Sequence, residues 1–394
     1  MPNASINPAV KALSPPPIPL VQQWGNSYDG SLGPLLDLSQ AVPGYPPHSA
    51  ILNWLAEAAA DASLAGYGNI EGESALRSAY ASHVSDLYNA SLVPANVHIT
   101  AGCNQAFIST MMAIAGAGDT ALLSNPFYFN HESTLDMLGI KTRLYETDPH
   151  TGFLPSLPSI QENLDDSVKA IVLISPNNPT GAVYPTDLLM RIYRLCQEKG
   201  LWLILDETYR DFLPTGREKP HALLNEKGWG ANFIQLYSFS KSFCIPGHRL
   251  GAVLAAPEVV QEIAKVMDNL QICAPRIPQM AVAKALPALT DWRQANRAEI
   301  AARATVLKEV MTQCPDWPIK AMGAYFAYIK HPFHAKSSTD VAKILATQCG
   351  VTCIPGEFFG TGQEQYLRVA FANADQQQLK LLSDRLIECQ ATIE

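Results

Sequence analysis

The 394-residue chain has few charged residues and lacks a long uninterrupted apolar stretch. Charged residues make up 16% of the sequence and the formal net charge is −8, so no excess of Lys and Arg is available to neutralise the phosphates of nucleic acid or of anionic lipid. No apolar run approaches the roughly 20 residues that a membrane-spanning helix requires. We therefore expect a protein that binds neither nucleic acid nor membrane, in which any cationic site is local.

The 8 cysteines are scattered, without a CxxC pair or the spacing of a metal site. This distribution is typical of reduced thiols in a cytoplasm rather than of a disulfide framework or a zinc centre. The first 24 residues also lack the basic and then apolar pattern of a secretory signal. These absences predict a cytoplasmic protein without a structural metal.

What the sequence does contain is a regular alternation of apolar runs. The length exceeds that of one ordinary core, which predicts a large and a smaller domain. Between about residues 95 and 256, short apolar runs alternate with helical patterns, as expected of parallel strands joined by helices. After Pro287 the pattern changes to a long amphipathic helix, a strand candidate and a further helix, which indicates a smaller α+β part. We predict strands at residues 121–123, 170–175, 201–205, 233–237, 252–255 and 325–329, and helices at 185–200, from 287 to about 313, and from 339.

The strongest chemical signal is the segment SFSKSFCIPGHRLG at residues 238–251, which follows a predicted strand. Lys241 lies among hydroxyls and ahead of Arg249. A lysine that attacks a carbonyl must be partly deprotonated, and nearby positive charge or desolvation achieves this. Ser238, Ser240 and Arg249 are also suitable donors to a phosphate. A polar loop with a solvated lysine is the alternative that this segment alone leaves open.

This segment resembles the signature of the class I and II aminotransferases, which are fold-type-I pyridoxal-phosphate enzymes. That signature is a serine-rich stretch, a Schiff-base lysine and a Gly-x-Arg-x-Gly box, here Gly247-His248-Arg249-Leu250-Gly251. The resemblance implies that Lys241 forms the internal aldimine with pyridoxal 5'-phosphate and later moves the substrate proton. It also implies that Arg249, Ser238 and Ser240 hold the cofactor phosphate.

Asp206 and Tyr209 lie at the end of the apolar run 201–205. The resemblance makes Asp206 the partner of the pyridinium nitrogen and Tyr209 a donor to the cofactor phenolate oxygen. An anionic carboxylate keeps the ring nitrogen protonated, so that the ring withdraws the electrons left on Cα when a bond breaks. A strand-end acid that caps a helix is the alternative for this segment taken alone.

Two more loops follow strands in the family order. Residues 175–181 (SPNNPTG) match the family's Asn-Pro-x-Gly box, which makes Asn178 a further donor to the phenolate oxygen. Gly102, Cys103 and Asn104 precede an apolar helix, whose free N–H groups stabilise an anion. They resemble the phosphate cup of the family, with an ordinary capped helix as the alternative.

Aromatic residues complete the predicted cofactor site. Tyr128 stands where the family has a residue that stacks on the pyridine ring, and we assign the nearby His131 no catalytic role. Tyr67, in the segment YGNIEG, resembles the tyrosine that reaches the phosphate of the neighbouring subunit. The resemblance therefore implies a homodimer with shared active sites.

Arg368 lies within the apolar strand pattern YLRVAF at residues 366–371, where an unpaired charge would be costly. The resemblance implies that Arg368, with Asn178, binds the substrate α-carboxylate. A structural ion pair is the alternative.

The sequence departs from the family in the N-terminal segment 36–44, which resembles the part that closes over the substrate. Ala41 stands there in place of the usual glycine, and its methyl group narrows the approach to the substrate carboxylate that the resemblance implies. We identify no arginine for a second carboxylate, since Asn269 is near the expected place and Arg276 lies a few residues later, leaving open whether Arg276 contacts substrate. An acidic substrate side chain is thus not indicated.

The resemblance implies an α/β fold of fold type I. We expect a mostly parallel seven-stranded sheet in a three-layer αβα domain at residues 48–286, and a smaller α+β domain from residues 1–47 and 287–394. The expected reaction moves an amino group between an L-amino acid and a 2-oxo acid.

Two alternatives stay open. The same cofactor supports elimination, cyclisation, decarboxylation or oxidation of an amino acid. A cofactor-binding regulator without turnover is a third hypothesis, although neither end of the chain has a basic DNA-binding segment.

Overall fold

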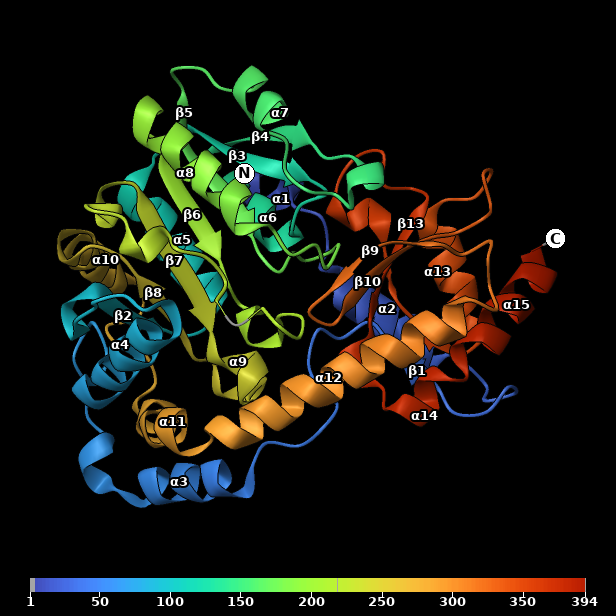
Figure 1. Ribbon diagram of the computed structural model, residues 1–394, viewed down its shortest axis with the longest axis horizontal. Coiled ribbons are helices and arrows are strands. Elements are labelled where there is room, and N and C mark those ends of the chain that lie inside the picture. The colour runs from blue at the N-terminus through green and yellow to red at the C-terminus, as the bar shows by residue number, and fades with distance from the viewer. Residues whose placement is uncertain (1–3, 218, 394) are drawn as a thin grey trace.

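The structure, a computed structural model, describes residues 4–217 and 219–393. Its larger lobe is built on a seven-stranded sheet with the order β2-β8-β7-β6-β5-β3-β4 (Figure 1). The pairs from β7 to β4 are parallel, so the predicted mostly parallel seven-stranded sheet is confirmed. The strands are β2 (Val97–Thr100), β3 (Thr120–Asn125), β4 (Lys141–Glu146), β5 (Val168–Ile174), β6 (Trp202–Asp206), β7 (Phe233–Ser238) and β8 (Gly251–Leu254).

The strand predicted at residues 252–255 exists as β8. The prediction that it runs parallel to its neighbours is wrong, because β8 is antiparallel to both β7 and β2. A parallel return needs a crossover, usually an α-helix, that carries the chain back along the length of the sheet. Between β7 and β8 the chain forms only the short helix α9 (Phe239–Ser242) and a 3-10 turn at Pro246–His248. The chain therefore reverses at one end of the sheet, and Lys241 and Arg249 both lie in that reversal.

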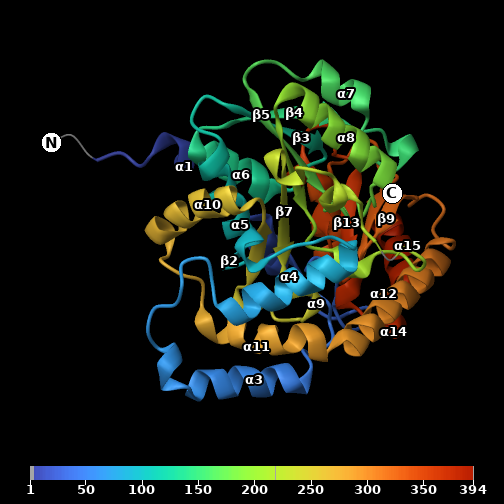
Figure 2. The ribbon, with the colours of Figure 1, turned by 60° about the vertical axis from the view of Figure 1, so that its left-hand side comes forward.

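Helices cover both faces of the large sheet, which makes three layers (Figures 1 and 2). Successive strand residues point to opposite faces, and in β6 Leu203 and Leu205 pack in one core cluster whereas Ile204 packs in another. Gly200 ends the predicted helix at 185–200, observed as α8 (Thr186–Lys199), with φ 66°, a left-handed conformation that glycine adopts without strain. One face is covered by α4 (Ser74–Tyr88), α7 (Leu157–Glu162), α8 (Thr186–Lys199) and α11 (Arg276–Ala288), with α3 (Ser49–Ala60) packed on α11. The other face is covered by α5 (Cys103–Ile114), α6 (Phe129–Leu138) and α10 (Pro257–Leu270).

The smaller lobe contains an antiparallel sheet of order β12-β13-β10-β9 and a two-stranded parallel sheet. In the latter, β1 (Leu36–Asp37) pairs with β11 (Val351–Thr352), so the N-terminal segment joins the C-terminal part. The long predicted helix is α12, which extends from the large lobe along the small one (Figure 1). The domain boundaries at residues 47 and 286 stay a prediction. The remaining elements are α1 (Pro8–Ala12), α2 (Pro17–Asn26), α12 (Thr290–Met311), β9 (Ile319–Gly323), β10 (Phe326–Lys330), α13 (Ser338–Thr347), β12 (Ile354–Pro355), β13 (Tyr366–Ala370), α14 (Gln376–Leu379) and α15 (Leu382–Ile393).

The start of the described chain extends away from the body of the molecule, and α1 packs on α6 (Figure 2). Among the described residues, no helix combines the length and the apolar character needed to cross a membrane.

Candidate active site

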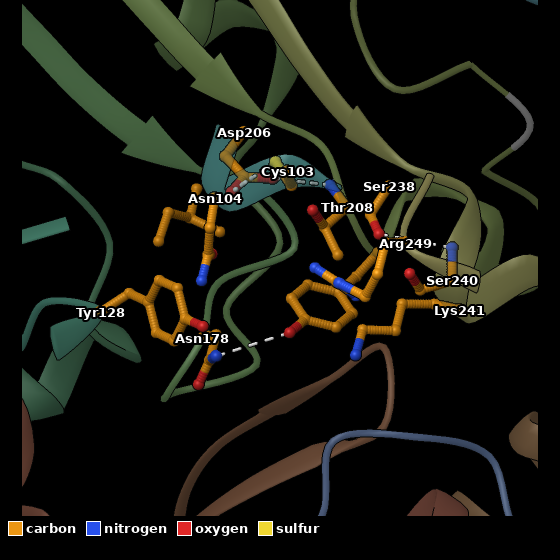
Figure 3. A pocket seen from close by; sticks show the side chains of 12 residues that line it. Cys103, Asn104, Tyr128, Asn178, Asp206, Thr208, Ser238, Ser240, Lys241 and Arg249 are labelled. Atoms are coloured by element: carbon orange, nitrogen blue, oxygen red, sulfur yellow. Dashed lines mark hydrogen bonds between the residues drawn. The ribbon is translucent and has the colours of Figure 1, made fainter. Parts of the chain in front are cut away.

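A cavity of about 200 Å³ lies at the carboxyl ends of three neighbouring parallel strands (Figure 3). Ile174, Asp206 and Ser238 are the last residues of β5, β6 and β7, and open α/β sheets bind ligands at such an edge because the following loops converge there. The cavity is lined by Cys103, Asn104, Tyr128, Ile174, Asn178, Asp206, Thr208, Tyr209, Ser238, Ser240, Lys241 and Arg249.

Lys241 is half-buried and presents its amine to this cavity (Figure 3). It lies on α9, which Ser238 caps by accepting a hydrogen bond from the Ser240 N–H at 3.3 Å. Desolvation lowers the pKa of Lys241 to about 8, and the positive charges of Arg249 and Arg368 act in the same direction. A fraction of the lysine is therefore neutral, and nucleophilic, near physiological pH.

Asp206 is buried opposite the lysine, on the last position of β6. The Thr208 N–H donates to Asp206 Oδ1 at 2.9 Å, and the Cys103 thiol donates to Oδ2 at 3.5 Å. His131 Nε2 lies 3.6 Å from Oδ2. Burial favours the neutral acid, but the interactions with His131 and Thr208 outweigh it and lower the pKa of Asp206 below its ordinary value. The cavity therefore holds a fixed carboxylate.

Asn178, Tyr209 and Arg368 form a connected group beside the lysine. The Asn178 amide donates to Tyr209 Oη at 3.4 Å, and Arg368 Nη1 donates to Asn178 Oδ1 at 3.0 Å. Arg368 is 1% exposed, Nη2 donates to the Ser39 carbonyl at 2.6 Å, and Nε has no partner among the described residues. Both acceptors are neutral, so no structural ion pair satisfies this buried guanidinium within the described chain.

The end of the cavity near the start of α5 and Arg249 has the donors that an anion requires. Gly102 has φ 92° and precedes α5, and a side chain there would clash with the Arg249 guanidinium. Gly102, the N-cap residue, has no side chain to cap the first N–H groups of α5, at Cys103 and Asn104. Ser240 Oγ is buried and has no partner among the described residues. Helix N–H groups, a guanidinium and a free hydroxyl therefore converge, a donor set that matches a phosphate.

Four predicted residues do not line this cavity, namely Ala41, Tyr67, Gly102 and Arg368. Of these, Gly102 approaches the Arg249 guanidinium and Arg368 is bonded to Asn178, so both adjoin the lining residues. Tyr67 is 80% exposed, and the Ala41 carbonyl accepts a hydrogen bond from Tyr325 Oη at 3.0 Å. Arg276 Nε donates to Glu73 Oε1 at 2.6 Å, and Nη1 donates to the Ser63 carbonyl at 2.8 Å. Within the single chain, Arg276 therefore bonds residues that do not line the cavity.

The structure brings to the site three residues that no sequence motif had indicated as functional. Ile174 and Thr208 line the cavity, and both stand inside or beside motifs that were recognised. His131, which was assigned no catalytic role, contacts the carboxylate of Asp206. The only signal for His131 was its position three residues after Tyr128, close to one turn along the same helix start.

The sequence model of the family "Aminotransferase class I and II" matches residues 34–386. The chain belongs to this family, and it is an enzyme that transfers amino groups. The chain is 28% identical over 358 residues to aromatic aminotransferase ISS1 of Arabidopsis thaliana, covering 89% of this chain and 88% of that one. It is 27% identical over 328 residues to aspartate aminotransferase of Sulfolobus acidocaldarius, covering 80% of each.

Solved structures of aminotransferases share the fold. A Thermus thermophilus aspartate aminotransferase double mutant superposes with a TM-score of 0.90 at 23% identity, over 98% of this chain and 100% of that one. An aromatic aminotransferase from Pyrococcus horikoshii superposes with a TM-score of 0.84 at 24% identity, over 91% and 96%. The predicted fold-type-I architecture is therefore confirmed.

Proposed function

We propose that this aminotransferase holds pyridoxal 5'-phosphate on Lys241 and moves an amino group between an L-amino acid and a 2-oxo acid. The observation that carries the proposal is the joint placement, in one cavity, of a lysine with lowered pKa, a fixed carboxylate and a phosphate-shaped set of donors. The lysine would react with the cofactor aldehyde, the carboxylate would pair with the ring nitrogen, and the donor set would bind the phosphate.

The described residues fit the cofactor group by group. Arg249, Ser238, Ser240 and the N–H groups at the start of α5, from Gly102 to Asn104, would hold the phosphate. Asp206 would face the ring nitrogen, Asn178 and Tyr209 the phenolate oxygen, and Tyr128 the face of the ring. When bound, the protonated pyridine ring supplies an electron sink for the electrons left on the substrate Cα.

The chain's own residues would do the rest of the chemistry. The neutral Lys241 amine, which lines the cavity, would accept the proton from the substrate Cα and donate it again as an ammonium group, as a general base of pKa about 8 can do near neutral pH. Arg368 would bind the substrate α-carboxylate in exchange for the neutral Ser39 carbonyl that it now contacts. A carboxylate compensates the buried guanidinium better than a neutral acceptor does.

We propose a substrate whose side chain carries no second carboxylate. Arg276 is bonded to Glu73 and to backbone carbonyls rather than free for a second carboxylate. The relatives differ in the substrates that their names state, which are aromatic amino acids, aspartate and, for a Mycobacterium tuberculosis relative 28% identical over 344 residues, valine with pyruvate. Mixing the holoprotein with these amino acids and their 2-oxo acids identifies the substrate pair.

We further propose a homodimer in which Tyr67 reaches the partner's cofactor phosphate. The large exposed fraction of Tyr67, 80%, supports this, because its loop is nevertheless fixed by the bonds of Arg276 to Ser63, Gly66 and Glu73. An exposed aromatic side chain on a rigid loop suits a protein partner. The eight unpaired thiols support our proposal of a cytoplasmic location.

The covalent link is tested by borohydride reduction of the cofactor-supplemented protein, digestion and mass spectrometry. We expect one adduct, on Lys241, and none in Lys241→Ala; an unmodified Lys241 in the wild-type protein would overturn the proposal. The reaction is tested by mixing the holoprotein with single amino acids. Stoichiometric 2-oxo acid with pyridoxamine phosphate supports transamination, whereas ammonia, carbon dioxide or peroxide without pyridoxamine phosphate selects another reaction.

A further inference from the structure

A chain of buried polar groups connects the end of β7 to α9. Tyr237 Oη lies 2.6 Å from Asp211 Oδ2 and 2.8 Å from Ser242 Oγ. Tyr237 is 0% exposed and Ser242 is 4% exposed. Ser242 directly follows Lys241, so these two hydrogen bonds end at the residue next to the cofactor lysine.

The direction of both hydrogen bonds is fixed by charge. Burial raises the pKa of Asp211, but the positive charges of Arg293 and Arg210 and the hydrogen bond from Tyr237 outweigh this and keep it below its ordinary value. Asp211 is therefore a carboxylate, which only accepts. The single phenol hydrogen of Tyr237 goes to Asp211, so the Ser242 hydroxyl must donate to Tyr237 Oη.

The aromatic ring of Tyr237 is itself held in place. The Arg210 guanidinium lies over it at 4.0 Å from the ring centroid, and Tyr80 stacks on it with centroids 5.5 Å apart and an interplanar angle of 26°. By contrast α9 has four residues, too few to be stable without external contacts. The Tyr237 hydroxyl is therefore held more rigidly than α9, and its hydrogen bond to Ser242 fixes the turn on which Lys241 lies.

We propose that Tyr237 is a positioning residue for the transamination reaction, which acts by holding Ser242 and thereby the backbone turn that directs the Lys241 amine into the cavity. The inference rests on the proposed role of Lys241. The hydrogen bonds from Ser242 through Tyr237 to Asp211 would then position the Lys241 amine, in addition to the packing of the Tyr237 ring in the core. A ring that only fills the core would serve equally well as phenylalanine, because the two rings occupy the same volume apart from the hydroxyl.

The test uses the holoenzyme of the wild type, Tyr237→Phe, Ser242→Ala and the double variant. Tyr193→Phe is the matched control, since Tyr193 is equally buried in the same core and its hydroxyl bonds Gln197 on α8. Two quantities are measured: the pH midpoint of the bound cofactor's absorption change, and kcat and KM at fixed pH. Melting temperatures show whether each variant folds.

In Tyr237→Phe we expect the pH midpoint of the absorption change to rise by about half a unit to one unit. A loosened turn admits water to the Lys241 nitrogen, and water stabilises the protonated form of that nitrogen. We also expect kcat to fall about three- to tenfold with little change in KM. Ser242→Ala should act in the same way, and the double variant should be no worse than either single one. Tyr193→Phe should match the wild type in both quantities.

A wild-type midpoint and kcat in Tyr237→Phe overturn the inference, as do additive effects in the double variant. Should Tyr237→Phe fail to fold, Ser242→Ala decides by the same criteria. Absence of the Lys241 adduct in the wild-type protein would instead refute the proposed function, so the two failures are distinguishable.

Discussion

His131 Nε2 lies 3.6 Å from Asp206 Oδ2, and the imidazole stacks on Phe107 with ring centroids 4.0 Å apart. The same ring meets Tyr128 edge-on at 5.3 Å. Hydrogen bonding and charge from His131 help to lower the pKa of Asp206 against the opposing effect of burial. His131 therefore supports both the carboxylate and the aromatic side chain that we propose to contact the cofactor ring.

Replacing His131 by phenylalanine should shift the activity profile towards higher pH. The new ring still stacks on Phe107, but it has no nitrogen to interact with Asp206, so burial raises the pKa of the carboxyl. Because Asp206 acts as a carboxylate, activity is lost as the pH falls through its pKa. A higher pKa therefore moves the acid limb of the kcat/KM profile upward. An acid limb that coincides with that of the wild type would show that His131 only fills space.

The sequence predicted the parts of the fold and site that depend on local patterns. The central strands β5, β6 and β7 are buried on both faces and so appear as continuous apolar runs, whereas the edge strand β4 (KTRLYE) mixes polar and apolar residues and was not predicted. Asn178, Asp206, Tyr209, Ser238, Ser240 and Lys241 were found because they end or follow these central strands, whereas Cys103, Asn104 and Tyr128 were found through the family resemblance. The role of His131 was not apparent, because its contact with Asp206 depends on how α6 packs against α5 rather than on any local pattern.

The rate at which cofactor-free protein combines with the aldehyde should increase with pH and level off above about pH 8. Only the neutral amine of Lys241 attacks, and its pKa is lowered to about 8, chiefly by desolvation and then by Arg249. Stopped-flow absorbance over pH 6–10 measures this midpoint. Arg249→Gln should move it upward, because one of the neighbouring charges is lost. A midpoint near that of free lysine in the wild type would contradict the expectation.

The lowered pKa also makes Lys241 unfavourable for stability in the cofactor-free protein. Folding disfavours the charged amine, so the cost is fully present below about pH 8 and disappears as the pH rises towards the value of the unfolded chain. Lys241→Met should therefore raise the melting temperature of the cofactor-free protein at pH 7 more than at pH 10. An equal change at both pH values would mean that only packing is involved.

Ser240→Ala should weaken cofactor binding without destabilising the cofactor-free protein. The hydroxyl is buried without a partner among the described residues, so its removal costs no hydrogen bond there, but a bond to a charged phosphate contributes about 1.5–3 kcal/mol, or roughly ten- to 150-fold in affinity. Titration with the cofactor and thermal melting of the cofactor-free protein measure the two effects. Thr110→Val is the control, since its hydroxyl is also buried and unpartnered but lies outside the cavity.

Arg368→Lys should raise the KM for the amino acid by at least about tenfold, with a smaller change in kcat. The guanidinium reaches Asn178 and the Ser39 carbonyl with two different nitrogens, and a lysine has one nitrogen and cannot present the paired donors that a carboxylate prefers. Steady-state kinetics measure the change. The matching amine without a carboxylate is the control substrate, and its slow single-turnover rate should be the same in both proteins. An unchanged KM for the amino acid would mean that the α-carboxylate binds elsewhere, and that the Arg368 charge serves only to lower the pKa of Lys241.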